Sequence, residues 1–171
     1  MSRRIAIIGN AGGGKTTLAR QLGEATGLPV FHLDNLLWQP GWQRLPEAAF
    51  DREHDALIAQ PAWIIDGVAY APALERRLAA ADEIVFIDFP LWRHYYWALK
   101  RQLKTLFVPR PEVAAGRAKL AHFRQIIQVI QLVDRELRPR WLALLQDYAG
   151  EKEITVIRRK KALAAYLAQQ N

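Results

Sequence analysis

A glycine-rich stretch near the start of the chain has the residue types and spacing needed to bind a chain of phosphates. Residues 9–17 read Gly-Asn-Ala-Gly-Gly-Gly-Lys-Thr-Thr and meet the pattern G-x-x-x-x-G-K-[ST] at Gly9, Gly14, Lys15 and Thr16. An apolar run precedes this stretch and a helical pattern follows it, which is the context that such a phosphate-binding loop requires. A plain glycine-rich turn is the alternative, but it does not need lysine and threonine at those two positions.

The composition of this loop predicts how it would hold ATP and Mg²⁺. Backbone N–H groups and the positive end of a helix would bind the phosphates, so the backbone must pass close to the ligand, which explains Gly12 to Gly14. Lys15 is expected to reach the β and γ phosphates, and the Thr16 hydroxyl is expected to coordinate Mg²⁺. The residues predicted to contact the nucleotide are Gly9, Asn10, Ala11, Gly12, Gly13, Gly14, Lys15, Thr16, Thr17 and Arg158.

Two aspartates that end apolar runs are candidates for holding a water molecule on the Mg²⁺. Asp66 follows residues 63–65 and precedes Gly67, whereas Asp88 follows residues 84–87 and precedes Phe-Pro. A carboxylate at the end of a strand beside the loop suits this task. We favour Asp66 because Gly67 lets the backbone approach a ligand, while Asp88 is equally typical of a helix N-cap.

Asp34 is the candidate residue for the site of the phosphoryl acceptor. It directly follows the apolar run 30–33, so we expect it at the carboxyl edge of a sheet. A carboxylate there can orient an acceptor hydroxyl and take its proton. The alternative is that Asp34 only caps the helix that follows the strand.

The positive charge of the chain is concentrated in one segment. Residues 93–140 contain eleven Lys or Arg against three Asp or Glu, a net charge of +8, so the rest of the +7 chain carries −1. This indicates an anionic partner, which could be nucleotide phosphates, a phosphorylated substrate or nucleic acid, although a solvated helix face is the simpler alternative. The prolines and arginines of residues 105–118 are typical of a lid that closes over a triphosphate. For Arg158, in the charged run 158–161, a solvated strand end is as favoured as a nucleotide contact.

Short apolar runs that alternate with helical patterns predict the positions of these residues in an α/β fold. The expected strands cover residues 4–8, 30–33, 63–65, 84–87 and 154–157, and near-continuous apolar strands of this kind form parallel sheets covered on both faces. We predict a single domain over residues 1–171 with three layers around a five-stranded parallel sheet. The chain has no cysteine, which excludes disulfides and a cysteine nucleophile, and it has no apolar run long enough for a membrane span. We therefore expect a cytoplasmic protein with no membrane partner.

Several segments together make the chain resemble the small P-loop kinases of the adenylate and shikimate kinase type. More closely, the chain resembles the bacterial topology-modulation family, which is described as adenylate-kinase-like. The segments that carry this resemblance are Ile-Ile-Gly-Asn-Ala-Gly-Gly-Gly-Lys-Thr-Thr-Leu-Ala, Phe-His-Leu-Asp-Asn-Leu-Leu-Trp-Gln-Pro-Gly-Trp, Trp-Ile-Ile-Asp-Gly, Phe-Ile-Asp-Phe-Pro-Leu-Trp and the Lys100-Arg101 pair.

The resemblance implies a P-loop NTPase fold, with a sheet order of 2-3-1-4-5, an acceptor flap at residues 35–60 and a lid at residues 105–118. It implies that Asp34 lies at the acceptor site, that Asp66 lies near the metal, and that Arg101 with lid arginines such as Arg110 or Arg117 clamps phosphates. The expected function is transfer of the γ-phosphoryl group of Mg-ATP to a nucleoside, nucleotide or sugar-acid-like acceptor. The alternative is a nucleotide-binding regulator that contacts nucleic acid through residues 93–140, although the spacing of Trp92, Tyr95 and Tyr96 predicts core packing.

Overall fold

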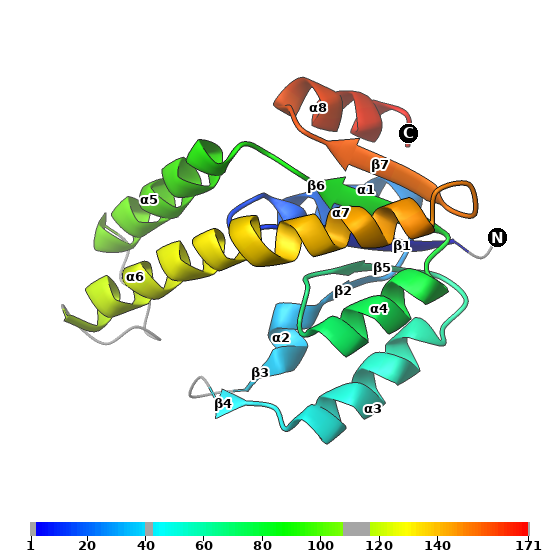
Figure 1. Ribbon diagram of the computed structural model, residues 1–171, viewed down its shortest axis with the longest axis horizontal. Helices are drawn as coiled ribbons and strands as arrows, with labels where there is room; N and C mark the ends of the chain where they lie inside the picture. Colours follow the sequence, from blue (N-terminus) through cyan, green and yellow to red (C-terminus); the bar gives the residue numbers. More distant parts are fainter. Residues whose placement is uncertain (1–2, 40–42, 108–116, 171) are drawn as a thin grey trace.

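A parallel β-sheet forms the centre of the computed structural model, which describes residues 3–39, 43–107 and 117–170. In the described residues, five strands lie side by side in the order β2-β5-β1-β6-β7, and each neighbouring pair is parallel (Figure 1). The strands of this sheet are β1 (Arg4–Gly9), β2 (Val30–His32), β5 (Trp63–Asp66), β6 (Glu83–Ile87) and β7 (Glu153–Ile157). The prediction of an α/β fold with a five-stranded parallel sheet is therefore confirmed.

The strand numbering differs from the predicted order 2-3-1-4-5, because the chain contains an additional pair of short strands. β3 (Trp38–Gln39) and β4 (Gln43–Arg44) pair with each other in antiparallel fashion and stay outside the main sheet. The five predicted segments of the main sheet nevertheless occupy the predicted neighbour positions.

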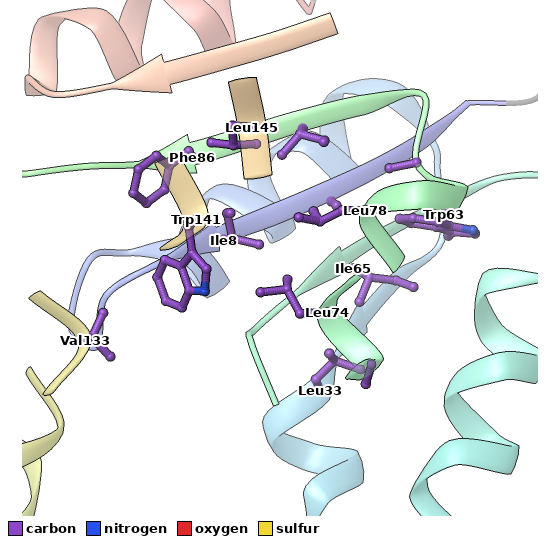
Figure 2. Close-up of a cluster of buried hydrophobic side chains, with 14 of the residues drawn as sticks. Ile8, Leu33, Trp63, Ile65, Leu74, Leu78, Phe86, Val133, Trp141 and Leu145 are labelled. Atoms are coloured by element: carbon purple, nitrogen blue, oxygen red, sulfur yellow. The ribbon is translucent and has the colours of Figure 1, made fainter. Parts of the chain in front are cut away.

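Helices cover both faces of the sheet. Successive side chains of β1 point to opposite faces, and because those of residues 5–8 are all apolar, each face is buried under helices. Ala6 and Ile8 face one core, which they share with the helices α3 (Glu47–Ile58), α4 (Ala71–Ala80) and α7 (Arg138–Asp147) (Figure 2). Ile5 and Ile7 face a second core with α1 (Lys15–Thr26) and α8 (Lys160–Ala168). All four of these β1 side chains have no exposed surface, so the strand that leads into the glycine-rich loop is held from both sides.

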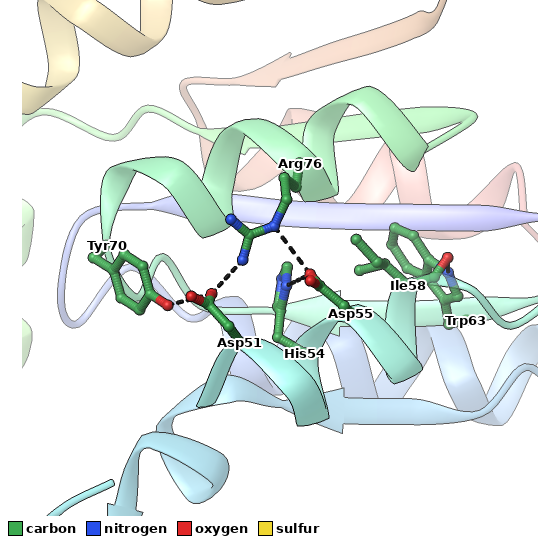
Figure 3. A network of polar contacts seen from close by, with 7 residues as sticks. All are labelled: Asp51, His54, Asp55, Ile58, Trp63, Tyr70 and Arg76. Carbon is green, nitrogen blue, oxygen red and sulfur yellow. Dashed lines mark hydrogen bonds and ion pairs between the residues drawn. The ribbon is translucent and has the colours of Figure 1, made fainter. Parts of the chain in front are cut away.

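A polar network joins helix α3 of the flap to helix α4 (Figure 3). The Asp51 carboxylate accepts hydrogen bonds from the Tyr70 hydroxyl and from Arg76, and the Arg76 Nε also donates to Asp55 at 3.0 Å. Burial together with the hydrogen bond to Asp51 raises the pKa of Tyr70 to about 12. Because charge-assisted hydrogen bonds are stronger than neutral ones, this network helps to hold α3 against α4.

The basic segment forms two helices that lie against each other and extend away from the sheet (Figure 1). They are α5 (Leu91–Phe107) and α6 (Arg117–Leu132), and a π-helical segment, Val133–Leu137, leads from α6 into α7. Pro139 lies in the first turn of α7. The hydrogen-bond spacing changes in the π-helical segment just before it, which accommodates a residue without a backbone N–H. Among the described residues, none of the helices is both long and apolar enough to cross a membrane.

Gly9 provides a test of how closely β1 and β6 must approach each other. It has a φ of +145°, and a Cβ at this position would lie 2.5 Å from the carbonyl oxygen of Ile87 in the neighbouring strand. We expect Gly9→Ala to lower the free energy of unfolding by at least about 2 kcal/mol, since it combines a backbone clash with a strained φ. Urea denaturation measures this loss.

Gly150→Ala is the matched control for the strain alone. Gly150 has a φ of +96°, but a Cβ there would meet nothing within 4 Å. We therefore expect Gly150→Ala to be the milder change, and a loss of stability as large as that of Gly9→Ala would contradict the role assigned to the close contact with Ile87.

Candidate active site

The glycine-rich loop connects the end of β1 to the start of α1, as the sequence predicted. Gly14 precedes the helix with a φ of +86°, a left-handed conformation that favours glycine at this turn. Lys15 begins α1 and is partly buried, and its Nζ donates to the carbonyl oxygen of Asn10 at 3.0 Å. The lysine side chain therefore folds back over the loop that would hold the phosphates.

Asp66 lies at the end of β5 and contacts the loop directly. The Thr16 Oγ1 donates a hydrogen bond to Asp66 Oδ2 at 2.8 Å, and the Asp66 residue is only 3 % exposed. On its other side, Asp66 Oδ1 contacts the Nδ1 of His32. The sheet register explains both contacts, since Asp66 pairs with Ile7 of β1 on one side and with His32 of β2 on the other.

Asp88, the other aspartate considered for the metal site, is instead paired with arginines. Its carboxylate accepts two hydrogen bonds from Arg138, at 2.5 and 3.0 Å, and one from the Nε of Arg158 at 3.2 Å. The Asp88 side chain is 3 % exposed, whereas that of Arg158 is 64 % exposed. The structure thus brings Thr16 to Asp66 and gives Asp88 two cationic partners.

Polar contacts also link the glycine-rich loop to the helices of the basic segment. The Asn10 Nδ2 donates to the carbonyl oxygen of Ile130 in α6 at 2.9 Å, and the Asn10 Oδ1 accepts from the backbone N–H of Ala11 at 2.7 Å. The ring of His94 in α5 lies between two carbonyl oxygens, with Nδ1 at 2.9 Å from Ala11 and Nε2 at 3.1 Å from Phe89. The loop is therefore in contact with both α5 and α6.

The buried ring of His94 predicts a pH dependence of stability. Burial is the main reason that the pKa of His94 lies below its ordinary value, and the same holds for His54. In the unfolded chain these rings would bind protons near pH 6.5, so below this pH the unfolded state binds more protons than the native state. The free energy of unfolding should therefore fall as the pH is lowered from about 7 to about 5.5.

Urea denaturation at the two pH values measures this effect. The His94→Gln variant lacks one of the two buried rings, His54 and His94, so its stability should depend less on pH than that of the original chain. An equal pH dependence in the two proteins would contradict the assignment to His94.

Asp34 lies in the first turn of the short helix α2 (Leu33–Leu37), and its side chain is exposed. The N-cap position of this helix is occupied by His32, and no side chain caps it. The alternative in which Asp34 serves as the helix cap is therefore wrong. Asp34 lies two residues after His32, which ends strand β2.

The predicted phosphate-binding arginines are only partly placed by the structure. Arg101 belongs to α5 and Arg117 is the first residue of α6. Arg110 and residues 108–116 of the predicted lid lie outside the described residues. The prediction that the α5 aromatics pack in the core is wrong for Trp92 and Tyr96, which are 62 % and 54 % exposed.

The residues around Thr16 and Asp66 suit a Mg²⁺ ion that is shared with phosphates. Within the part of the chain that the structure describes, no group of three or more His, Cys, Asp or Glu side chains could hold a metal ion. One hydroxyl and one carboxylate do fit Mg²⁺, because this ion prefers oxygen ligands, keeps several waters and is completed by substrate phosphates. Thr16 and Asp66 could therefore hold Mg²⁺ together with a nucleotide.

His32 and His94 are the two site residues to which the sequence assigned no role. His32 stands beside Asp34 at the end of a predicted strand, which is the one sequence signal that could have singled it out. His94 gives no comparable signal, because it lies within a helical pattern and approaches the glycine-rich loop only through the fold.

Comparison with known proteins identifies the fold. No family model matches the sequence, and no curated protein matches it. Among solved structures, shikimate kinase from Acinetobacter baumannii in complex with shikimate aligns with a TM-score of 0.55 and 15 % identity, over 98 % of this chain and 89 % of that chain. Shikimate kinase from Bacteroides thetaiotaomicron aligns with a TM-score of 0.55 and 15 % identity, over 98 % of this chain and 95 % of that chain. The chain therefore has a fold like that of the shikimate kinases.

Proposed function

We propose that this protein is a kinase that transfers the γ-phosphoryl group of Mg-ATP to a small acceptor molecule. The hydrogen bond of 2.8 Å between Thr16 and Asp66 supports this proposal most strongly, because it joins the glycine-rich loop to the carboxylate expected beside Mg²⁺. The fold shared with the shikimate kinases supports the same reaction class. The specific resemblance to the topology-modulation family remains a sequence-based hypothesis.

In this proposal the chain contributes positioning and electrostatic stabilisation. The backbone N–H groups of residues 9–17 hold the phosphates, and Lys15 leaves the Asn10 carbonyl oxygen to bind the β and γ phosphates. Mg²⁺, when bound, neutralises charge on the phosphate oxygens. Arg101, Arg110 and Arg117 are proposed to stabilise the transferring group, and Arg158 is proposed to contact the nucleotide.

The exposed carboxylate of Asp34 favours an acceptor with a hydroxyl group. A hydroxyl needs a group that orients it and takes its proton, whereas an acceptor phosphate needs arginine partners and no base. The flap carries Arg44 and Arg52, both exposed, so a phosphate acceptor has some support as well. Nucleosides and sugar acids are therefore the first acceptors to test, and nucleoside monophosphates the second.

A coupled assay of ADP release over nucleosides, nucleotides and sugar acids, shikimate included, tests the proposal. The expected result is Mg²⁺-dependent ADP release that requires one acceptor class and stays at the background rate without it. ADP release at the same rate with and without every acceptor would indicate an ATPase instead. No nucleotide binding at all would contradict the proposal.

The exposed aromatics of α5 favour a second candidate function, a regulator that contacts nucleic acid. Trp92 and Tyr96 are accessible for stacking on bases, and α5 contains no Asp or Glu. Binding of DNA that depends on phosphate contacts would weaken steeply between low and moderate salt. Fluorescence anisotropy with a labelled oligonucleotide measures this, and a weak interaction that does not depend on salt would contradict the regulator.

A further inference from the structure

We propose that His32 is a positioning residue that fixes the orientation of the Asp66 carboxylate toward the metal site. This inference rests on the proposed function, since Asp66 has this task only if the site binds Mg²⁺ with a nucleotide. The contact that carries it joins the Nδ1 of His32 to the Oδ1 of Asp66. The imidazole thus contacts the carboxylate oxygen of Asp66 that Thr16 does not contact.

The chemistry of the two contacts defines which group donates. A carboxylate only accepts hydrogen bonds, so the Nδ1 of His32 must carry the proton, and the Thr16 hydroxyl donates to the other oxygen. Each oxygen of Asp66 is thus held by one protein donor. The hydroxyl oxygen of Thr16 keeps its lone pairs, which remain available to a metal ion.

The positions of His32 and Asp66 are set by the backbone of two neighbouring strands. His32 and Asp66 are direct neighbours in the parallel register of β2 and β5, and the strands hold both residues at the same edge of the sheet. The Asp66 side chain is 4 % exposed and the His32 side chain 28 % exposed. His32 therefore covers one side of a buried carboxylate and is itself reachable from solvent.

Arg77 also acts on Asp66, but it does not fix the direction of the carboxylate. The buried Arg77 guanidinium interacts electrostatically with Asp66, while its Nη2 donates to the carbonyl oxygen of Gly67 at 2.6 Å. A charge interaction of this kind does not select a rotamer of the carboxylate. The orientation of Asp66 is left to its two hydrogen-bond donors, His32 and Thr16.

The test compares metal binding in the original chain and in the His32→Ala variant. Removal of the imidazole leaves the Oδ1 of Asp66 without its donor, so the carboxylate can rotate away from the metal site. Loss of such a supporting group typically weakens metal affinity by about 10- to 100-fold, and we expect a loss in this range. Electron paramagnetic resonance of Mn²⁺, used as the metal probe in the presence of ADP, measures the affinity without any need for turnover.

Two further variants show whether a loss of Mn²⁺ affinity comes from the orientation of Asp66 or from a general disturbance of strand β2. His32→Asn places an amide N–H close to the position of Nδ1 and should restore Mn²⁺ affinity to within about threefold of the original chain. Val30→Ala shortens an apolar side chain on the same strand, far from any polar contact with Asp66, and should leave Mn²⁺ affinity unchanged. Affinity for ADP without metal should be similar in all these proteins. If His32→Ala does not fold, the comparison of His32→Asn with His32→Gln carries the test, because glutamine moves the amide one carbon further out.

The possible outcomes distinguish this inference from the proposed function. Equal Mn²⁺ affinity in the original chain and in His32→Ala, or in His32→Asn and His32→Gln if the alanine variant does not fold, overturns the role of His32 and leaves the kinase proposal intact. An equal loss in Val30→Ala also overturns it, because the effect would then come from the strand. If the original chain binds neither ADP nor Mn²⁺ with ADP, both proposals are overturned.

Discussion

Lys15→Ala is expected to remove most of the proposed kinase activity. Lys15 is the only charged residue of the glycine-rich loop, and its Nζ lies over the loop at 3.0 Å from the Asn10 carbonyl oxygen. A cation aimed at the transferring phosphate acts where negative charge develops, and loss of one such preorganised group typically costs about 10²- to 10³-fold in kcat. We expect at least this loss in the ADP-release assay.

The Lys15→Ala variant should also bind ATP more weakly, because we propose that the lysine contacts the β and γ phosphates before transfer. Isothermal titration with a non-hydrolysable ATP analogue measures this separately from turnover. Lys161→Ala is the matched control, since Lys161 is exposed on α8 and its loss changes the net charge equally. Full activity in Lys15→Ala would contradict the assignment of the loop to phosphate binding.

The elements that the sequence predicts best are those whose signals are local. The apolar run before Gly9 and the Gly-Lys-Thr that follows specify a strand, a turn and a helix start through residues that are neighbours in the chain. The same is true of Asp66, because a carboxylate directly after a buried strand must lie at the carboxyl edge of a parallel sheet. The local residue pattern was therefore sufficient to predict the positions of the glycine-rich loop and of Asp66.

The contacts that define the site depend on the sheet register, which the sequence does not show. His32 and Asp66 are 34 residues apart and meet because β2 and β5 are neighbours. Asp88 meets Arg138 and Arg158, which lie 50 and 70 residues further along the chain. The sequence favours Asp66 only through the neighbouring Gly67, whereas the structure separates the two carboxylates directly by their partners.

The prediction that Trp92 and Tyr96 pack in the core failed for a different physical reason. Their spacing places them on one face of a helix, and apolar residues on one face usually pack against a core. In this fold α5 extends away from the sheet beside α6, so that face has no core to meet (Figure 1). Helical periodicity predicts which residues share a face, but it does not predict what the face contacts.

Asp34→Asn is the second change for which we expect a large effect, and it tests the nature of the acceptor. The asparagine keeps the size of the side chain and one acceptor oxygen, but it cannot take a proton. If the acceptor is a hydroxyl and Asp34 is its general base, kcat should fall by about 10²- to 10⁴-fold, while ATP binding stays close to that of the original chain. Steady-state kinetics with the acceptor found in the screen separates the two parameters.

The position of Asp34 makes this result interpretable. Because the side chain is exposed and does not cap α2, its replacement should not destabilise the fold, and a loss of rate then reports on chemistry. Glu53→Gln, an exposed neutralised carboxylate on α3 of the same flap, should leave kcat unchanged. An unchanged rate in Asp34→Asn would exclude this carboxylate as the base. The acceptor would then be one that needs no base, and a phosphate held by the flap arginines Arg44 and Arg52 would become the favoured interpretation.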